Sequence, residues 1–408
     1  MKHGLVTLIL SVVFISGCGS GGDEDALPAN IQFVTNKTLE GLYNQVSACY
    51  TTNSNTAIPK VDARNAEYNL ATILSPLPTI CDTDSPLDLV MKSYNFPSGN
   101  VGLGALDIVR SSDQSKIITS VDYLTDHLGG LAVFSVPAPT VTTPVLGIQL
   151  KGVPSGSGSF KLSDFDGSWA FLSLQVNGRS VAAEIDLSNV GELNQARLQT
   201  GYQSNDSVSP LVLKTGGSGL VIGRTSTSNE ISLNSGLDKL NFLGWEWFLN
   251  PAGTFGLTGG GASGPGFDRL AVMFRPRKLS AEFEGTYEII QWTTFSSNIS
   301  VPGSGVTTTD IPSSEIVRRG RIEFRGGTAV FDNLLGLTNQ SISYDIQPGT
   351  DYMYRFSILD NRQEKDVFIR FFVSHDQKYL IGVDLADESP DDHRTALLVG
   401  IRHSFKAF

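Results

Sequence analysis

The sequence is poor in the residue types on which most catalytic and metal chemistry depends. Its 408 residues include five histidines and three cysteines, and none stands in a His-x-x-x-His or Cys-x-x-Cys spacing that would indicate a zinc site. No phosphate-binding loop ends in Gly-Lys-Ser or Gly-Lys-Thr. The nearest match to a serine-hydrolase elbow, residues 216–219, has Leu220 where a second glycine is required. We therefore expect a protein that is not an enzyme and that needs no cofactor.

Charged residues are also scarce, and their balance is acidic. They make up 17% of the chain, and 30 Lys and Arg against 41 Asp and Glu give a net charge of −11. Nucleic-acid-binding proteins need a basic surface, so this balance excludes nucleic acid as a partner. It also argues against electrostatic docking on anionic lipid headgroups.

The apolar stretch at the N-terminus is too short to cross a membrane as a helix. It covers residues 5–15, after the basic start Met1-Lys2-His3, whereas a membrane-spanning helix takes roughly twenty residues. A basic start, a short apolar stretch and small residues before a cleavage site are typical of a secretory signal peptide. We expect residues 1–17 to be removed.

The residues Ile15-Ser16-Gly17-Cys18 resemble the lipobox of bacterial lipoproteins. The resemblance implies diacylglycerol on the sulfur of Cys18 and a further acyl chain, such as palmitate, on its new amino group. Several acyl chains anchor a protein firmly, because each buried methylene contributes about 0.8 kcal/mol. Residues 18–29 then form a flexible tether. Gly19, in place of a retention aspartate, implies the outer membrane, with the periplasmic and surface sides both open.

Two cysteines remain once Cys18 carries lipid. Cys49 and Cys81 would lie in an oxidising compartment, which favours a disulfide bond over a thiol site. In the chain-entropy view, closing a loop of this length stabilises a fold by roughly 3–4 kcal/mol.

Three segments of the chain resemble one another. Residues 162–169 read LSDFDGSW, residues 279–287 read LSAEFEGTY, and residues 39–43 form a shorter copy, LEGLY. Similar phrases recur near the segment ends and predict related domains. The expected last strands are at residues 130–134, 268–274 and 393–399, and the expected preceding hairpins are at residues 113–122, 253–258 and 376–384.

Short alternating apolar and polar runs, separated by Gly, Pro, Asn and Asp, predict strands and little helix. About eight strands in each segment indicate an all-β protein of tandem small antiparallel barrels, a closed form that leaves no exposed edges. The alternative is a β-propeller, since residues 112–116 resemble a blade motif. We expect a divergent β domain at residues 30–138, a linker rich in Pro, Thr, Gly and Ser at 139–160, and barrel repeats at 161–277 and 278–408.

The repeated phrase is similar to the start of calycin (lipocalin-like) barrels, in which an aromatic residue of the first strand meets an arginine of the last strand. The resemblance implies the structural pairs Trp169 with Arg277 and Tyr287 with Arg402. Both arginines lie six residues after an aligned alanine, Ala271 or Ala396. Segment one has Ala138 at the arginine position.

An acidic loop between two predicted strands is the one candidate metal site. Its carboxylates offer the oxygen ligands that Ca²⁺ prefers, although the spacing is not that of an EF-hand. The equally simple interpretation is solvated charge. The five residues are Asp384, Asp387, Glu388, Asp391 and Asp392.

Two functions fit this sequence. In the first, the anchored domains are an envelope structural or protein-interaction module with packed interiors. In the alternative, they bind a small apolar ligand in the manner of lipocalins. The sequence favours the first and identifies neither the protein partner nor the ligand.

Overall fold

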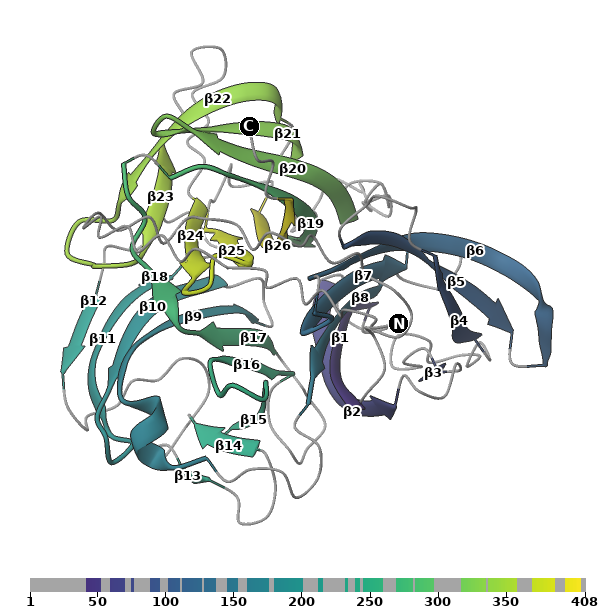
Figure 1. Ribbon diagram of the computed structural model, residues 1–408, viewed down its shortest axis with the longest axis horizontal. Helices are drawn as coiled ribbons and strands as arrows, with labels where there is room; N and C mark the ends of the chain where they lie inside the picture. The colour runs from purple at the N-terminus through teal and green to yellow at the C-terminus, as the bar shows by residue number, and fades with distance from the viewer. Residues whose placement is uncertain are drawn as a thin grey trace, which may run out of the picture.

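A computed structural model describes residues 42–52, 59–69, 75–76, 89–95, 102–110, 112–126, 128–136, 145–152, 160–175, 180–200, 212–215, 232–233, 239–242, 245–259, 269–281, 283–296, 317–334, 337–357, 369–385 and 393–404. Most of them lie in strands. Figure 1 shows three rolled antiparallel sheets grouped around a common centre. They are domain 1 (residues 42–152), domain 2 (160–275) and domain 3 (276–404).

Domain 3 is a closed antiparallel barrel. From β19 to β26 each strand pairs with the next along the chain, and β19 also pairs with β26, which closes the ring. The short β18 adds to β24. The strands are β18 Pro276–Arg277, β19 Gly285–Ser296, β20 Val317–Arg325, β21 Thr328–Leu334, β22 Leu337–Ile346, β23 Tyr354–Ser357, β24 Ile369–Ser374, β25 Tyr379–Asp384 and β26 His393–Ser404.

Domain 2 has the same winding. Its first strand, β9, pairs with its second strand on one side and with its last strand, β17, on the other. A turn of 3₁₀ helix, η3 (Leu162–Phe165), leads into β9. The strands are β9 Gly167–Gln175, β10 Ser180–Leu187, β11 Leu193–Thr200, β12 Val212–Thr215, β13 Ser232–Leu233, β14 Lys239–Phe242, β15 Trp245–Leu249, β16 Phe255–Thr258 and β17 Arg269–Phe274.

Domain 1 repeats the pattern once more, because its first strand pairs with its last, β1 with β8. The predicted tandem antiparallel barrels are thus confirmed. The propeller alternative is wrong, since each sheet rolls onto its own first strand. The strands are β1 Leu42–Thr52, β2 Pro59–Asn69, β3 Ser75–Pro76, β4 Leu89–Asn95, β5 Leu103–Arg110, β6 Asp113–Thr125, β7 Leu131–Val136 and β8 Val145–Lys151.

The predicted boundaries of domain 1 need correction. Residues 145–151, placed in the linker at 139–160, form β8, which pairs with both β1 and β7. The predicted last strand at residues 130–134 is therefore the penultimate strand, β7. The hairpin expected at residues 113–122 lies in β6, one strand earlier still. Surrounding Pro, Thr and Gly residues masked the alternation of Leu146, Ile148 and Leu150.

Interior and exterior side chains alternate along the first and last strands of each domain, and both faces are buried. In β17, Ala271 and Met273 point into domain 2, whereas Leu270, Val272 and Phe274 join a cluster outside it. Strands buried on both faces read as continuous apolar runs, as residues 270–274 (LAVMF) do.

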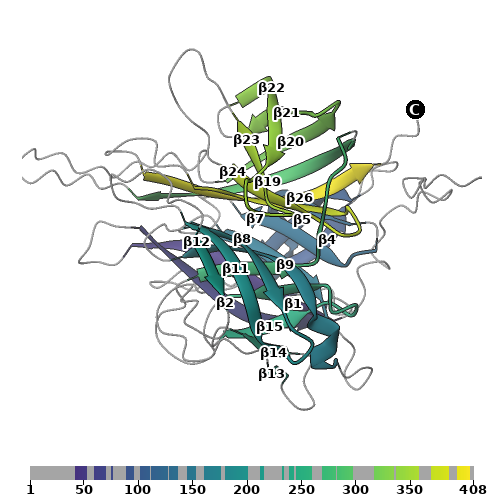
Figure 2. The ribbon, with the colours of Figure 1, turned by 90° about the vertical axis from the view of Figure 1, so that its left-hand side faces the viewer.

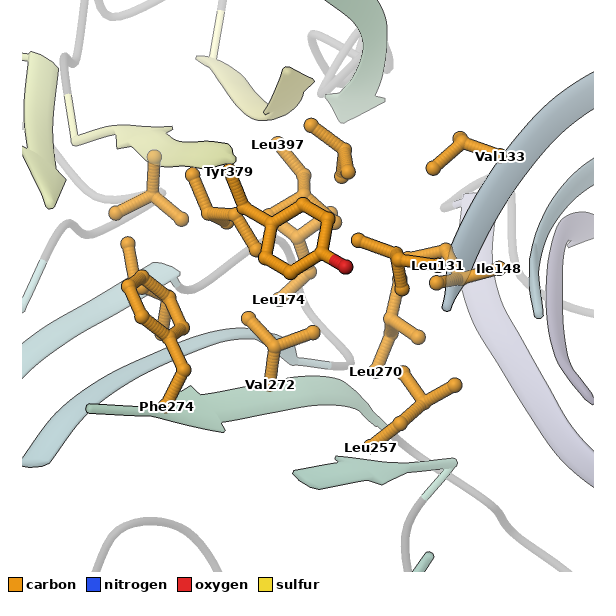
Figure 3. Close-up of a cluster of buried hydrophobic side chains, with 14 of the residues drawn as sticks. Leu131, Val133, Ile148, Leu174, Leu257, Leu270, Val272, Phe274, Tyr379 and Leu397 are labelled. Carbon is orange, nitrogen blue, oxygen red and sulfur yellow. The ribbon is translucent and has the colours of Figure 1, made fainter. Parts of the chain in front are cut away.

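The outward-facing apolar residues of all three domains form one central core (Figure 3). Leu131 and Ile148 enter from domain 1, Leu270 and Val272 from domain 2, and Leu397 from domain 3. Burying each such side chain contributes about 1.5–3 kcal/mol. Figure 2 shows the side view, in which β19 to β26 lie over the strands of the other two domains. The three domains are therefore packed as one body.

Helix plays almost no part in the described residues. No helix among them is long and apolar enough to cross a membrane.

Candidate functional site

One hydrogen-bonded turn precedes the penultimate strand in each domain. Its fourth residue has a positive φ, which suits glycine, and donates its N–H to the carbonyl of the first residue. The side chain of that first residue accepts the N–H that opens the next strand. The turns are Asp126 to Gly129 (2.9 Å, φ 66°), Asn250 to Gly253 (2.9 Å, φ 63°) and Ser374 to Gln377 (2.8 Å, φ 58°), and the side-chain bonds join Asp126 with Leu131 (2.7 Å), Asn250 with Phe255 (3.0 Å) and Ser374 with Tyr379 (2.9 Å).

A cationic residue lies at or just beyond the end of the last strand of each domain, or close to it, and makes the same backbone hydrogen bond in all three domains. Its backbone N–H donates to the carbonyl of the residue directly after the turn. The three bonds are Lys151 to Gly130 (2.8 Å), Arg275 to Thr254 (2.9 Å) and Arg402 to Lys378 (2.8 Å). Segment one is therefore a true third copy, with Lys151 at the position where the sequence indicated Ala138.

The partner of Trp169 is Arg275, which corrects the predicted pair with Arg277. The guanidinium carbon of Arg275 lies 4.3 Å from the centre of the indole ring, and Nη1 donates to the carbonyl of Ser168 at 3.2 Å. Arg277 instead lies in β18, opposite Val373 of domain 3. Such a stacked cation is worth about 0.5–2 kcal/mol. Burial of Arg275 lowers the pKa of its guanidinium, while Asp166 and Asp186 act in the opposite sense.

Tyr287 and Arg402 lie opposite each other on β19 and β26, as predicted. They meet at Gln377, because the Tyr287 hydroxyl donates to its carbonyl at 2.8 Å and Arg402 Nη1 donates to its side-chain oxygen at 2.5 Å. The ring beneath the guanidinium is that of Phe283, 5.9 Å away, rather than Tyr287. Burial raises the pKa of Tyr287 above its ordinary value. In domain 1, Tyr43 likewise donates to Gly129 at 2.6 Å and faces Lys151.

The described interiors are filled by side chains. In domain 3, Phe324 packs within 6.2 Å of five aromatic rings, among them Phe356 and Phe371. In domain 2, Trp247 packs edge-on against Phe171 with their centres 5.8 Å apart. Domain 1 is filled partly by polar groups, which satisfy one another. The Tyr123 hydroxyl donates to Gln149 (2.9 Å), and the Gln149 amide donates to Gln45 (2.9 Å).

A β ribbon formed by β5 and β6 extends from domain 1, on the side away from domains 2 and 3 (Figure 1). Among the described strands, β6 pairs with β7 through residues 123–125 alone, whereas its pairing with β5 continues to Asp113. Residues 113–118 are exposed, and Ile117 and Ile118 retain 52% and 40% of their accessible surface. The pairing register with β5 shifts between Thr119 and Ile117. This ribbon is the candidate interaction site, and the sequence analysis missed it.

Several predicted site residues lie outside the described residues. These are Cys18, Cys81, Asp387, Glu388, Asp391 and Asp392. Cys49 is a residue of β1. Because Cys81 lies outside the described residues, the disulfide between the two stays a prediction. Asp384 is the last residue of β25 and is 1% exposed, hence it belongs to the barrel wall and not to the acidic loop. No group of three or more His, Cys, Asp or Glu in the described part of the chain is placed to hold a metal ion.

Comparison with known proteins identifies no family. No protein-family model matches the sequence, and no curated protein matches it either. A double mutant of the vaccine antigen Transferrin Binding Protein B from Haemophilus parasuis is similar in structure, with 11% identity and a TM-score of 0.27 over 90% of this chain and 76% of that one. The isotype 1 protein of the same name from serogroup B Neisseria meningitidis gives 6% identity and a TM-score of 0.26 over 89% and 76%. Scores this low do not establish a shared fold or ligand.

Proposed function

We propose that this chain is a lipoprotein anchored to the outer membrane through Cys18, and that it serves as an envelope structural or protein-interaction module. The observation that carries the proposal is the β5–β6 ribbon, which presents two exposed isoleucines beyond the end of β7. An extended partner segment can add to such an edge through main-chain hydrogen bonds, with pockets for alternate side chains giving specificity. The lipobox residues 15–18 support the anchor.

The packing of the domains favours a protein partner over the lipocalin-like alternative. A ligand carried inside a small barrel needs a cavity, whereas the interiors of domains 2 and 3 are occupied by clustered aromatic residues. Trp169 and Trp247, both completely buried, fill domain 2. The three domains also share one apolar core, so the module presents the ribbon from a single packed body.

The partner surface is tested by mild crosslinking in intact cells followed by purification of the chain. The Ile117→Lys and Ile118→Lys double variant should lose the crosslinked partner, because the lysine charges on β6 oppose burial of this strand against a partner. Val190→Lys is the matched control, since Val190 is 58% exposed and lies in domain 2. Equal recovery of the same partner by the double variant and the control would contradict the ribbon as the binding surface.

The anchor is tested separately with the Cys18→Ser variant. It should lose labelling by a clickable fatty acid and accumulate as the uncleaved precursor, because the sulfur that receives the diacylglycerol is gone. Cys49→Ser is the control and should still be labelled. Labelling that persists in Cys18→Ser would refute the anchor without affecting the ribbon.

A further inference from the structure

The segment before the first strand closes one end of the barrel in domains 2 and 3. In domain 2, Phe165 of η3 stacks on Trp169 with the ring centres 5.7 Å apart, and its carbonyl accepts the indole N–H at 2.8 Å. In domain 3, the ring centre of Phe283 lies 6.5 Å from that of Tyr287 and 5.3 Å from that of Phe324. Both closing phenylalanines are buried, and each precedes the first-strand aromatic residue by four positions.

The arginine near the end of the last strand holds this closing segment. Arg275 Nη2 donates to the carbonyl of Asp164 at 2.9 Å, and Arg402 Nη2 donates to the carbonyl of Glu284 at 2.9 Å. The acceptor is a main-chain oxygen, which a residue of any type supplies. In domain 1, Lys151 stands at the position of the two arginines.

The parts that receive a closing segment are also present in domain 1. Tyr43 takes the place of Trp169 and Tyr287, and its hydroxyl donates to the carbonyl of Gly129 at 2.6 Å. It is completely buried, whereas an aromatic residue at an open barrel end would keep part of its ring exposed. The residue four positions before Tyr43 is Leu39, which lies outside the described residues.

The turn before the penultimate strand shows a second contact of the closing segment. In domain 2, Phe160 packs on this turn, where a Cβ added to Gly253 would lie 2.7 Å from Cε1 of the ring. In domain 3 the turn carries Gln377 with a similar positive φ, and the residue that corresponds to Phe160 is Lys278. The backbone conformation of the turn therefore accepts glutamine, and glycine provides the space for an overlying apolar residue.

We propose that residues 34–39 dock on the end of domain 1 and close it. Leu39 covers the ring of Tyr43, as the two phenylalanines cover theirs. Val34 precedes Leu39 by five positions, the same spacing as between Phe160 and its closing phenylalanine, and it packs over Gly129. The occupant of this surface is thus the protein's own N-terminal segment.

The docking shortens the reach of the proposed anchor, and only this consequence rests on the lipidation of Cys18. An extended chain spans at most about 3.5 Å per residue, so the reach from Cys18 falls from about 85 Å, measured to Leu42, to about 55 Å, measured to Val34. The β5–β6 ribbon starts at the same end of domain 1, because β6 ends at Thr125 beside the turn and its hairpin with β5 lies at the far end. The ribbon is then presented on the side away from the membrane.

Limited trypsin digestion of the purified mature protein tests the docking, with or without the lipid. Lys37 is the only lysine or arginine between Cys18 and Lys60, so cleavage there reports on this segment alone. Leu39→Asp should be cleaved at Lys37 about tenfold faster or more, because a charge opposes burial against Tyr43 and cleavage tracks the population of the open segment. Leu39→Phe, which copies the residue of domains 2 and 3, should remain as protected as the unmodified chain.

The matched control is Leu27→Asp, the same change nearer the lipid, which should leave the cleavage rate at Lys37 unaltered. Hydrogen exchange of β8 should be the same in all variants, which distinguishes release of the segment from unfolding of domain 1. If Leu39→Asp unfolds the domain, a photo-crosslinker decides. The residue p-benzoylphenylalanine in place of Leu39 should crosslink to peptides that contain Tyr43 or Gly129. Equal cleavage rates in Leu39→Asp and Leu39→Phe, or crosslinks confined to other parts of the chain, would overturn the proposal.

Discussion

The hydroxyl of Tyr379 joins domain 3 to domain 1 through a bond to Asp126. The oxygen atoms are 2.6 Å apart and both side chains are buried. A hydrogen bond to a charged group contributes about 1.5–3 kcal/mol. Tyr379→Phe keeps the ring against Phe255 and should lower the free energy of unfolding by about that amount, measured by urea denaturation.

The control for this substitution is Tyr352→Phe, which removes the hydroxyl of a partly exposed tyrosine. It should change the free energy of unfolding by less than about 0.5 kcal/mol. Equal stability of Tyr379→Phe and Tyr352→Phe would show that the bond to Asp126 contributes nothing to the joining of the domains.

The same tyrosine should make stability depend on pH in the alkaline range. Burial, the Asp126 charge and the Asp126 hydrogen bond raise the pKa of Tyr379 well above its ordinary value of 10.0. The folded state therefore retains this proton after the unfolded chain has lost it. The contribution of the hydroxyl is complete below about pH 10 and is lost as the pH rises further.

The measurement is the difference in unfolding free energy between the unmodified chain and Tyr379→Phe at several pH values. It should be constant from about pH 7 to 9 and should shrink by about 1.4 kcal/mol per pH unit above pH 10. Taking the difference cancels the contributions of other alkaline groups, such as Tyr287. A difference that stays constant to pH 11 would contradict the raised pKa.

Single residues also show where sequence reasoning reached its limit. The sequence predicted that Trp169 packs against an arginine, but it did not identify which arginine. Counting from Ala271 selected Arg277, whereas β17 ends at Phe274, which lies opposite Ala170 in β9. The next residue, Arg275, therefore faces Trp169. Strand register depends on pairing that a single sequence does not reveal.

At the scale of elements, β7 and β8 show how one glycine sets the packing of a strand pair. A Cβ added to Gly147 would lie 2.2 Å from Cζ of Phe134 and 2.3 Å from its Cε1. Phe134 faces Gly147 directly in the pairing of β7 with β8. Gly147→Ala should cost about 1–3 kcal/mol of unfolding free energy because the buried ring has to move.

A double-mutant cycle tests the cause. Phe134→Leu removes the ring, so adding Gly147→Ala to it should cost clearly less than Gly147→Ala alone. The expected coupling between the two residues is about 0.5–3 kcal/mol, measured by urea denaturation. Strictly additive costs would place the strain elsewhere than between Gly147 and Phe134.

The elements of domains 2 and 3 were more predictable than those of domain 1. Their opening phrases are intact, so the starts of β9 and β19 could be predicted from residues 162–169 and 279–287. In domain 1 the phrase is shortened, and β8 lies among Pro, Thr and Gly residues that are typical of a linker. The turn before β7 was not predicted, although its Asp126 and Gly129 have the chemistry of a turn.

At the scale of the whole molecule, the domains depend on one another. Tandem barrels can fold independently when each strand buries only its inner face, as in many small antiparallel domains. The structure instead buries both faces of β9, β17 and β26. Continuous apolar runs such as residues 270–274 carried that signal. The domain against which each of these strands packs depends on long-range contacts, which a single sequence does not reveal.

Polar contacts between domains 2 and 3 reinforce the shared core. The Glu184 carboxylate accepts the backbone N–H groups of Asp351 and Tyr352 at 2.9 and 2.8 Å, and it also pairs with Arg197. Arg370 donates to Gln199 at 2.6 Å. Each of these bonds satisfies a buried polar group at the interface, and separating the domains would exchange it for a bond to water.

The last prediction follows from this mutual burial. Fragments of residues 158–277 and 278–408 would expose Leu172 and Val272 in one case and Leu397 and Val399 in the other, all now buried in the central core. Each fragment should self-associate or lack a cooperative unfolding transition, whereas the full chain should unfold in one transition. Exposed apolar patches of this kind drive association. Circular dichroism with thermal melting, and size-exclusion chromatography with light scattering, measure both properties.

Mixing the fragments should restore a one-to-one complex by re-forming the shared face. Two monomeric fragments that each melt cooperatively, at the temperature of the full chain, would show that the barrels are independent and that the central core contributes little.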